Sequence, residues 1–196
     1  MRDARAKLLR AAVRVFSQKG YRAASTREIA RRAKVNPVTL FRLFKGKAGL
    51  RAAVVDFMFA NIEFGARLAP RLEHPLDGPE FIQVVIDTLL EAFYASPDFY
   101  RIITYFALEN DPKTMRAVRR ELKPAYALAA SHLETRMRSK RFRKVDALVA
   151  ARLITAAAFH HYRISELFQG EKVQGFRARQ WSRQCADIIY RGLKAD

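Results

Sequence analysis

The side chains most able to do chemistry in this sequence are the lysines and arginines of its first 51 residues. This stretch holds fifteen of them against only Asp3 and Glu28, a net charge of +13 within a total of +18. So dense a group of cations is suited to binding the phosphates of a polyanion, although charge alone does not separate a nucleic acid from a membrane surface. The alternative is a well-solvated amino terminus that binds nothing.

The first of these cations are predicted to lie on two short helices. Apolar residues from Leu8 to Phe16 recur at helical spacing, and Gly20 should end that helix because glycine tolerates the left-handed conformation. The next segment, Ser25-Thr26-Arg27-Glu28, fits a capping box. In that motif the Ser25 hydroxyl accepts from the Glu28 amide, while the Glu28 carboxylate reaches back to the Ser25 amide.

A third helix is predicted after the turn Lys34-Val35-Asn36, because Asn36 is a good N-cap and Pro37 suits a first helical position. Its residues divide into an inner face of Leu40, Phe41 and Phe44 and an outer face of Val38, Thr39 and Arg42. Lys47 then opens a fourth helix. Two helices joined by a three-residue turn favour a helix-turn-helix that enters the major groove of DNA.

Arg42 is the outward side chain best suited to a bidentate contact with guanine. The alternative for this residue is an ordinary solvated surface arginine.

The stretch from Leu9 to Leu50 resembles the TetR family of transcriptional regulators. The resemblance rests on Phe16, Gly20-Tyr21, Ser25-Thr26-Arg27-Glu28-Ile29-Ala30, Ala33-Lys34-Val35, Thr39-Leu40-Phe41-Arg42-Leu43-Phe44, Lys47 and Leu50. It covers about a quarter of the chain. The family implies an all-helical homodimer with amino-terminal DNA-binding heads and carboxy-terminal bodies that dimerise and bind a small effector.

Residue by residue, the resemblance implies that Arg27 and Thr39 reach a phosphate or a base edge, and that Lys47 contacts the DNA backbone. With Val38 and Arg42 these form the expected DNA-binding set. The sequence departs from the family pattern at Lys34, Asn36, Val38, Phe41 and Leu43. Phe41 stands where a tyrosine usually touches phosphate, so that hydroxyl contact is absent here.

Residues 52–196 are expected to form a helical body, separate from the DNA-binding domain of residues 1–51. Breaks at Pro70–Pro79, Ser96-Pro97-Asp98 and Asn110-Asp111-Pro112 separate amphipathic helices, and Pro124 should kink or split the helix that contains it. The basic run from Arg136 to Lys144 is interpreted as a solvated loop. The resemblance implies an effector pocket in this body, and its candidate lining residues are Tyr105, Phe106, Tyr126 and His161.

The last two predicted helices, near Val145–Phe168 and Phe176–Leu193, carry more apolar surface than one intramolecular neighbour would cover. One stripe contains Leu148 and Leu153, and another on the final helix contains Ile188. Two such helices per subunit could form a four-helix homodimer interface, which is also where the family dimerises. The alternative is the ordinary core of a monomer.

Other classes of protein are disfavoured by what the sequence lacks. Glycine and proline total only 15 residues and one cysteine is present, so a turn-rich all-β fold, a disulfide framework and a cysteine-rich zinc site are excluded. No nucleotide-binding motif or hydrolase constellation is found, and no metal or cofactor is expected. Charges interrupt every run long enough to span a bilayer, which predicts a cytoplasmic protein without a membrane segment.

The sequence therefore predicts an all-α DNA-binding protein. The resemblance implies a transcriptional regulator, a repressor released from a pseudo-palindromic double-stranded operator by a small-molecule effector. Two alternatives remain open. One is an architectural DNA- or RNA-binding helical protein without sequence preference. The other is a helical enzyme or ligand-binding protein with an incidental basic head.

Overall fold

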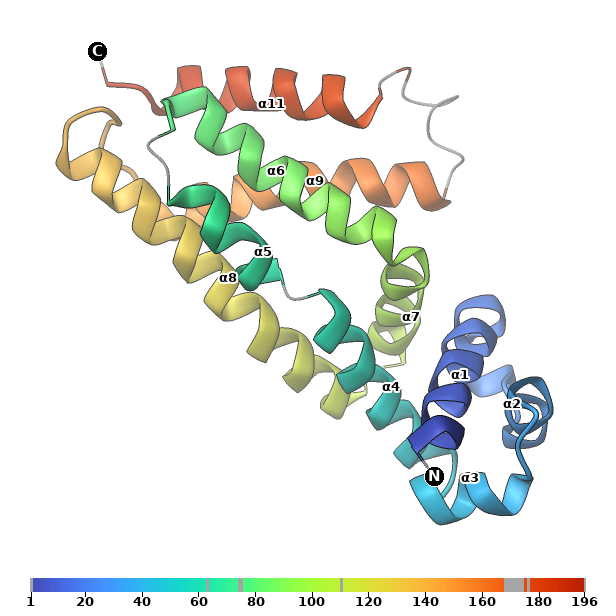
Figure 1. The fold of residues 1–196 in the computed structure, drawn as a ribbon. Helices are drawn as coiled ribbons and strands as arrows, with labels where there is room; N and C mark the ends of the chain where they lie inside the picture. The colour runs from blue at the N-terminus through green and yellow to red at the C-terminus, as the bar shows by residue number, and fades with distance from the viewer. Residues whose placement is uncertain are drawn as a thin grey trace. The chain divides into compact units, whose positions relative to one another are not determined.

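The computed structural model describes residues 2–62, 64–73, 76–109, 111–167, 175 and 177–195. Every regular secondary-structure element in these residues is a helix, and one isolated bridge joins Phe142 and Lys194. The predicted all-α class is therefore confirmed. The chain folds into two compact units (Figure 1). One contains residues 1–62 and 96–120, and the other contains residues 63–95 and 121–196.

The first unit begins with the predicted head. Its helices are α1 (Arg2–Ala23), α2 (Thr26–Ala33), α3 (Pro37–Phe44), α4 (Lys47–Ile62), α7 (Pro97–Leu108) and the first turns of α8 (Pro112–Arg138). Helix α1 packs against α2, α3, α4 and α7. The compact unit is thus larger than the predicted head, and the functional boundary at residue 51 stays a prediction.

Gly20 interrupts α1, as its sequence context predicts, with φ 72° and ψ 173°. The chain turns there and places the Tyr21 ring 5.7 Å from that of Phe16 and 6.1 Å from that of Phe106. Phe106 is fully buried in this aromatic cluster, and Tyr105 lies against Gly20. The glycine therefore allows α1 to end against α7.

An ion-pair cluster ties α4 to the start of α8. Arg51 contacts Asp111 at 2.6 Å and Glu109 at 3.3 Å, and its guanidinium lies 4.0 Å from the centre of the Tyr21 ring. Asp111 also caps α8, since its other carboxylate oxygen accepts from the Thr114 amide at 2.8 Å and from the Thr114 hydroxyl. The Asp111 carboxylate thus caps the start of α8 and also pairs with Arg51 of α4.

The second unit contains α5 (Phe64–Leu68), the 3₁₀ helix η1 (Ala69–Leu72), α6 (Gly78–Ala95), the later turns of α8, α9 (Ala147–Leu167) and α11 (Ala178–Leu193). Helices α6, α9 and α11 pack side by side (Figure 1). At the start of α6, Gly78 leaves room for the Tyr190 ring of α11, which would lie 2.1 Å from a Cβ at that position.

Two predictions about α8 hold only in part. Of the predicted kink or split at Pro124, the split is wrong, because the helix continues from Pro112 to Arg138 with the proline inside it. A proline removes one backbone donor, and the remaining hydrogen bonds of a long helix carry it past the gap. In the basic run, Lys140, Arg141, Arg143 and Lys144 are exposed after the end of α8, as predicted, but Arg136 is not part of a solvated loop. It lies in the last turn of α8, 4.1 Å from the centre of the Phe81 ring, and donates to the carbonyl of Leu76.

Candidate nucleic-acid interface

Helix α2 is fixed at both ends by local hydrogen bonds. The Ser25 hydroxyl accepts from the Glu28 amide at 3.1 Å, which is the first half of the predicted capping box. The Glu28 carboxylate instead binds Lys19 at 2.9 Å and Arg32 at 3.1 Å, since charge-assisted hydrogen bonds are stronger than a bond from a neutral amide. The hydrogen bond from Lys19 lowers the pKa of Glu28. The second half of the box is therefore replaced by an ion pair.

Lys34 ends α2 in the left-handed conformation, with φ 54°, where glycine would be the favoured residue. Its amide and that of Val35 bond carbonyls in the last turn of α2, and the chain then enters α3. Asn36 caps α3 by accepting from the Val38 amide at 2.8 Å, and Pro37 is the first helical residue. The predicted helix-turn-helix is thus present, with the predicted caps.

Helix α3 turns Leu40 and Phe44 into the core and leaves its other face open. Val38 is 73% exposed, Arg42 is exposed and Thr39 is partly exposed. Phe41, which the sequence places in the core, is 51% exposed, so that prediction is wrong. An eight-residue helix buries a narrow face, and Leu40 and Phe44 already fill it. The outer face of α3 therefore presents two apolar side chains beside one guanidinium.

The other candidate DNA-binding residues flank this helix-turn-helix. Arg27 is exposed in the first turn of α2. Lys47 begins α4, where its ammonium donates to the carbonyl of Arg22 at 3.0 Å and lies 4.5 Å from the centre of the Tyr21 ring. Burial lowers the pKa of Lys47. This lysine therefore helps to join α1 to α4, whatever it contacts outside the chain.

The four candidate effector residues divide between the two units. Tyr105 and Phe106 contact α1 in the first unit. In the second unit, Tyr126 lies near the Arg152 guanidinium, and buried His161 stacks on Trp181 with ring centres 5.5 Å apart. Their joint lining of one effector pocket stays a prediction. The adjacent His160 is exposed, and its ring centre lies 6.0 Å from that of the same Trp181.

The chain is similar to known proteins in sequence and in fold. Residues 8–54 match the model of bacterial regulatory proteins of the tetR family. A bacterial regulatory protein of the tetR family from Rhodococcus RHA1 has the same fold, with a TM-score of 0.78 at 19% identity over 98% of each chain. The chain carries this TetR-family segment within a fold that solved TetR-family proteins share. That family is one of transcriptional regulators rather than enzymes.

Two curated TetR-like relatives align with part of the chain. An uncharacterized HTH-type transcriptional regulator, YvkB of Bacillus subtilis, is 46% identical over 61 residues, which cover 31% of this chain and 32% of YvkB. The HTH-type transcriptional activator FasR of Mycolicibacterium smegmatis is 32% identical over 123 residues, 63% of this chain and 53% of FasR. The chain thus spans a third to a half of the lengths of the curated relatives it matches.

The described part of the chain offers little for other chemistry. It contains no group of three or more histidine, cysteine or acidic residues able to hold a metal ion. Burial raises the pKa of the Cys185 thiol, which disfavours the reactive thiolate. Within the same residues, no helix combines the length and the apolarity needed to cross a bilayer.

Proposed function

We propose that this TetR-family protein is a sequence-specific DNA-binding transcriptional regulator. The observation that carries the proposal is the outer face of α3, which is held by caps at both ends and exposes Val38, Phe41 and Arg42. The surrounding 51 residues carry +13 of charge, which supplies affinity for the phosphates on either side of a major groove. Helix α3 is the element that would enter that groove.

The side chains of α3 can recognise bases by hydrogen bonds and by apolar contacts. Arg42 can donate two hydrogen bonds to guanine, and the apolar Val38 and Phe41 suit the methyl group of thymine. Arg27, Thr39 and Lys47 are proposed to contact the backbone or a base edge. Contacts of these residues with phosphates would fix the register of the protein on the duplex.

Arg42→Ala is expected to cost about 1–3 kcal/mol of discrimination at one base pair, whereas Lys47→Ala should weaken all sequences about equally. The duplex is first selected from a random pool with the wild-type protein. Binding of single-base variants is then measured at fixed salt, and a duplex with uracil for thymine tests the apolar contacts. The reverse pattern for the two variants would overturn these roles.

Comparison of the selected duplex with random duplex also separates the proposal from its main alternative. An architectural DNA- or RNA-binding protein would bind both equally well, whereas a regulator should prefer the selected site. Repression is the direction we propose. Activation is the alternative, because the more extended of the two curated matches is to a protein named as an activator.

A homodimer through the last two helices is part of the proposal. Helix α9 buries Ala151, Ile154 and Ala158 but exposes Leu148, Val149 and Leu153, and α11 exposes Ile188. Leu148, Leu153 and Ile188 belong to the stripes predicted to meet a second copy, and exposed Val149 adds to them. A dimer would place two heads in successive major grooves, about 34–36 Å apart.

Sedimentation at micromolar concentration should give twice the chain mass of 22.5 kDa. Leu153→Glu should shift the protein toward the monomer, because it places a charge in an apolar contact. Leu108→Glu is the matched control, since Leu108 is also exposed but lies on α7. A single monomeric species in the wild type would refute the dimer.

Release of the operator by a small effector completes the proposal. Tyr105, Phe106, Tyr126 and His161 remain its candidate contacts, and a cytoplasmic location is proposed with it. Tenfold release of DNA requires about 1.4 kcal/mol of coupling between the two sites. An effector that binds tightly without changing operator affinity would contradict this mechanism.

A further inference from the structure

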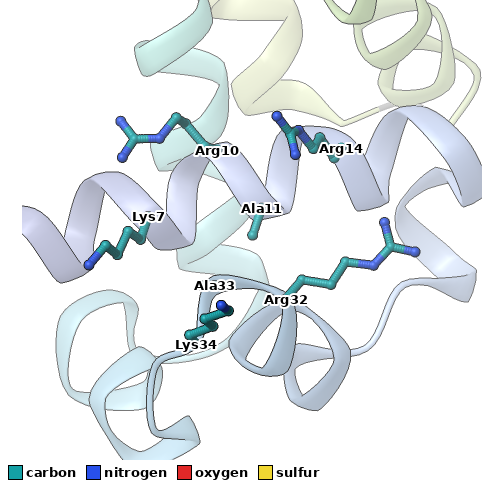
Figure 2. A pocket seen from close by; sticks show the side chains of 7 residues that line it. All are labelled: Lys7, Arg10, Ala11, Arg14, Arg32, Ala33 and Lys34. Atoms are coloured by element: carbon teal, nitrogen blue, oxygen red, sulfur yellow. The ribbon is translucent and has the colours of Figure 1, made fainter.

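A basic groove lies between α1 and the end of α2, apart from the outer face of α3. It has a volume of about 360 Å³, and five cationic side chains line it: Lys7, Arg10, Arg14, Arg32 and Lys34. Figure 2 shows Lys7, Arg10 and Arg14 along α1 and Arg32 and Lys34 at the end of α2, with the guanidinium groups of Arg10 and Arg14 directed away from α2. No acidic residue is among its lining residues.

The fold explains why the cations gather there. Lys7, Arg10 and Arg14 are three and four residues apart, so they share one face of α1. The groove between the helices remains open because Ala11 and Ala33, the other two lining residues, are small and buried. The left-handed turn at Lys34 brings the fifth cation to the end of α2.

Internal partners neutralise only part of this charge. Lys7 pairs with Asp3 at 2.6 Å, and Arg32 pairs with Glu28 at 3.1 Å. Across the described ranges, Arg10, Arg14 and Lys34 have no carboxylate oxygen within 4.0 Å of their side-chain nitrogens. Three cations without an anionic partner repel each other, and an anion placed among them would remove that repulsion.

We propose that this groove is a phosphate-binding site. Arginine guanidinium groups match the oxygens of phosphate and donate two parallel hydrogen bonds. Arg10 and Arg14 are exposed, so their side chains can turn toward α2, and they are the main ligands of the proposed site. Lys7, Arg32 and Lys34 add charge at the edges. The phosphate can come from the backbone of bound DNA, a source that rests on the proposed function, or from a free phosphate in solution, a source that does not.

The test uses the full chain with Arg10→Gln and Arg14→Gln combined, which removes two charges and keeps polar side chains. Arg141→Gln combined with Arg143→Gln is the matched control, because both arginines are exposed in the segment after α8. Unfolding curves of both variants should match the wild type. Inorganic phosphate is titrated at constant ionic strength, and the amide resonances of Ala11 and Ala33 are followed by NMR.

If the site binds phosphate, both amides shift in the wild type and the control but not in the groove variant. If DNA supplies the phosphate, the groove variant weakens selected and random duplex by the same factor. The slope of log K against log salt then falls by about 0.9 for each lost contact. Amide shifts with an unchanged slope assign the site to free phosphate.

The proposal is overturned if neither the amide shifts nor the salt slope differs between the groove variant and the control. Failure of the proposed function gives a separate result, because a wild type that does not bind DNA can still show the amide shifts. The two conclusions are therefore tested independently.

Discussion

Replacing Arg51 by methionine is expected to lower the free energy of unfolding by about 2–4 kcal/mol. Arg51 is only 17% exposed and Asp111 only 9%, and their atoms are 2.6 Å apart. Removing one partner of a buried ion pair costs about 3–5 kcal/mol when burial is complete. The expected loss is smaller here because Asp111 keeps its hydrogen bonds from Thr114. The stacking of Arg51 on Tyr21 is lost as well.

Urea denaturation followed by circular dichroism measures this loss. Arg191→Met is the matched control, because its ion pair with Asp187 is mostly exposed and should contribute no more than about 1 kcal/mol. Arg51→Lys should recover part of the stability, since lysine restores the charge but not the planar fork. Equal losses for Arg51→Met and Arg191→Met would contradict the structural role of this cluster.

Gly49→Ala is the second change for which we expect a large effect. A Cβ at position 49 would lie 1.9 Å from the Phe44 carbonyl oxygen and 3.0 Å from its carbon, and backbone atoms cannot rotate away. The start of α4 must then move from the end of α3. Overpacking of this kind costs about 3 kcal/mol at the upper end of its usual range. Because Phe44 ends α3, DNA binding should fall too.

Gly65→Ala is the control for this substitution, since nothing lies within 4 Å of a Cβ at Gly65 of α5. At a helical position without a clash, alanine stabilises by roughly 0.5–1 kcal/mol relative to glycine. The two substitutions should therefore have opposite signs in thermal and urea unfolding. A stabilised Gly49→Ala would mean that α3 and α4 are not in close contact.

The ends of the helices were the most predictable part of this fold. Ser25, Asn36 and Pro37 start their helices through hydrogen bonds and backbone limits that involve only neighbouring residues. The same holds for Pro97 and Pro112, which begin α7 and α8. Signals of this kind can be read from a short stretch of sequence, because the hydrogen bonds they form join neighbouring residues. Glu28 is the exception, since its carboxylate pairs with Lys19 of α1 and not with the Ser25 amide.

What covers each helix face could not be predicted in the same way. Phe41 has the periodicity of a core residue, but Leu40 and Phe44 occupy the buried face of α3. Arg136 belongs to a run of charges that suggests solvent, yet Phe81 lies against its guanidinium. Periodicity does not say how narrow the buried face of so short a helix is, nor that Phe81, distant in sequence, packs against Arg136. The position of Phe106 beside Phe16 and Tyr21 has the same origin.

At Lys34, which has the left-handed conformation, the stability of the head and the proposed binding of an anion favour different residues. Glycine there would relieve about 1 kcal/mol of backbone strain. It would also remove one of the five cations of the groove between α1 and α2. Selection for a more stable head would therefore favour glycine at position 34, although glycine weakens anion binding. We expect thermostable homologues to have glycine at this position.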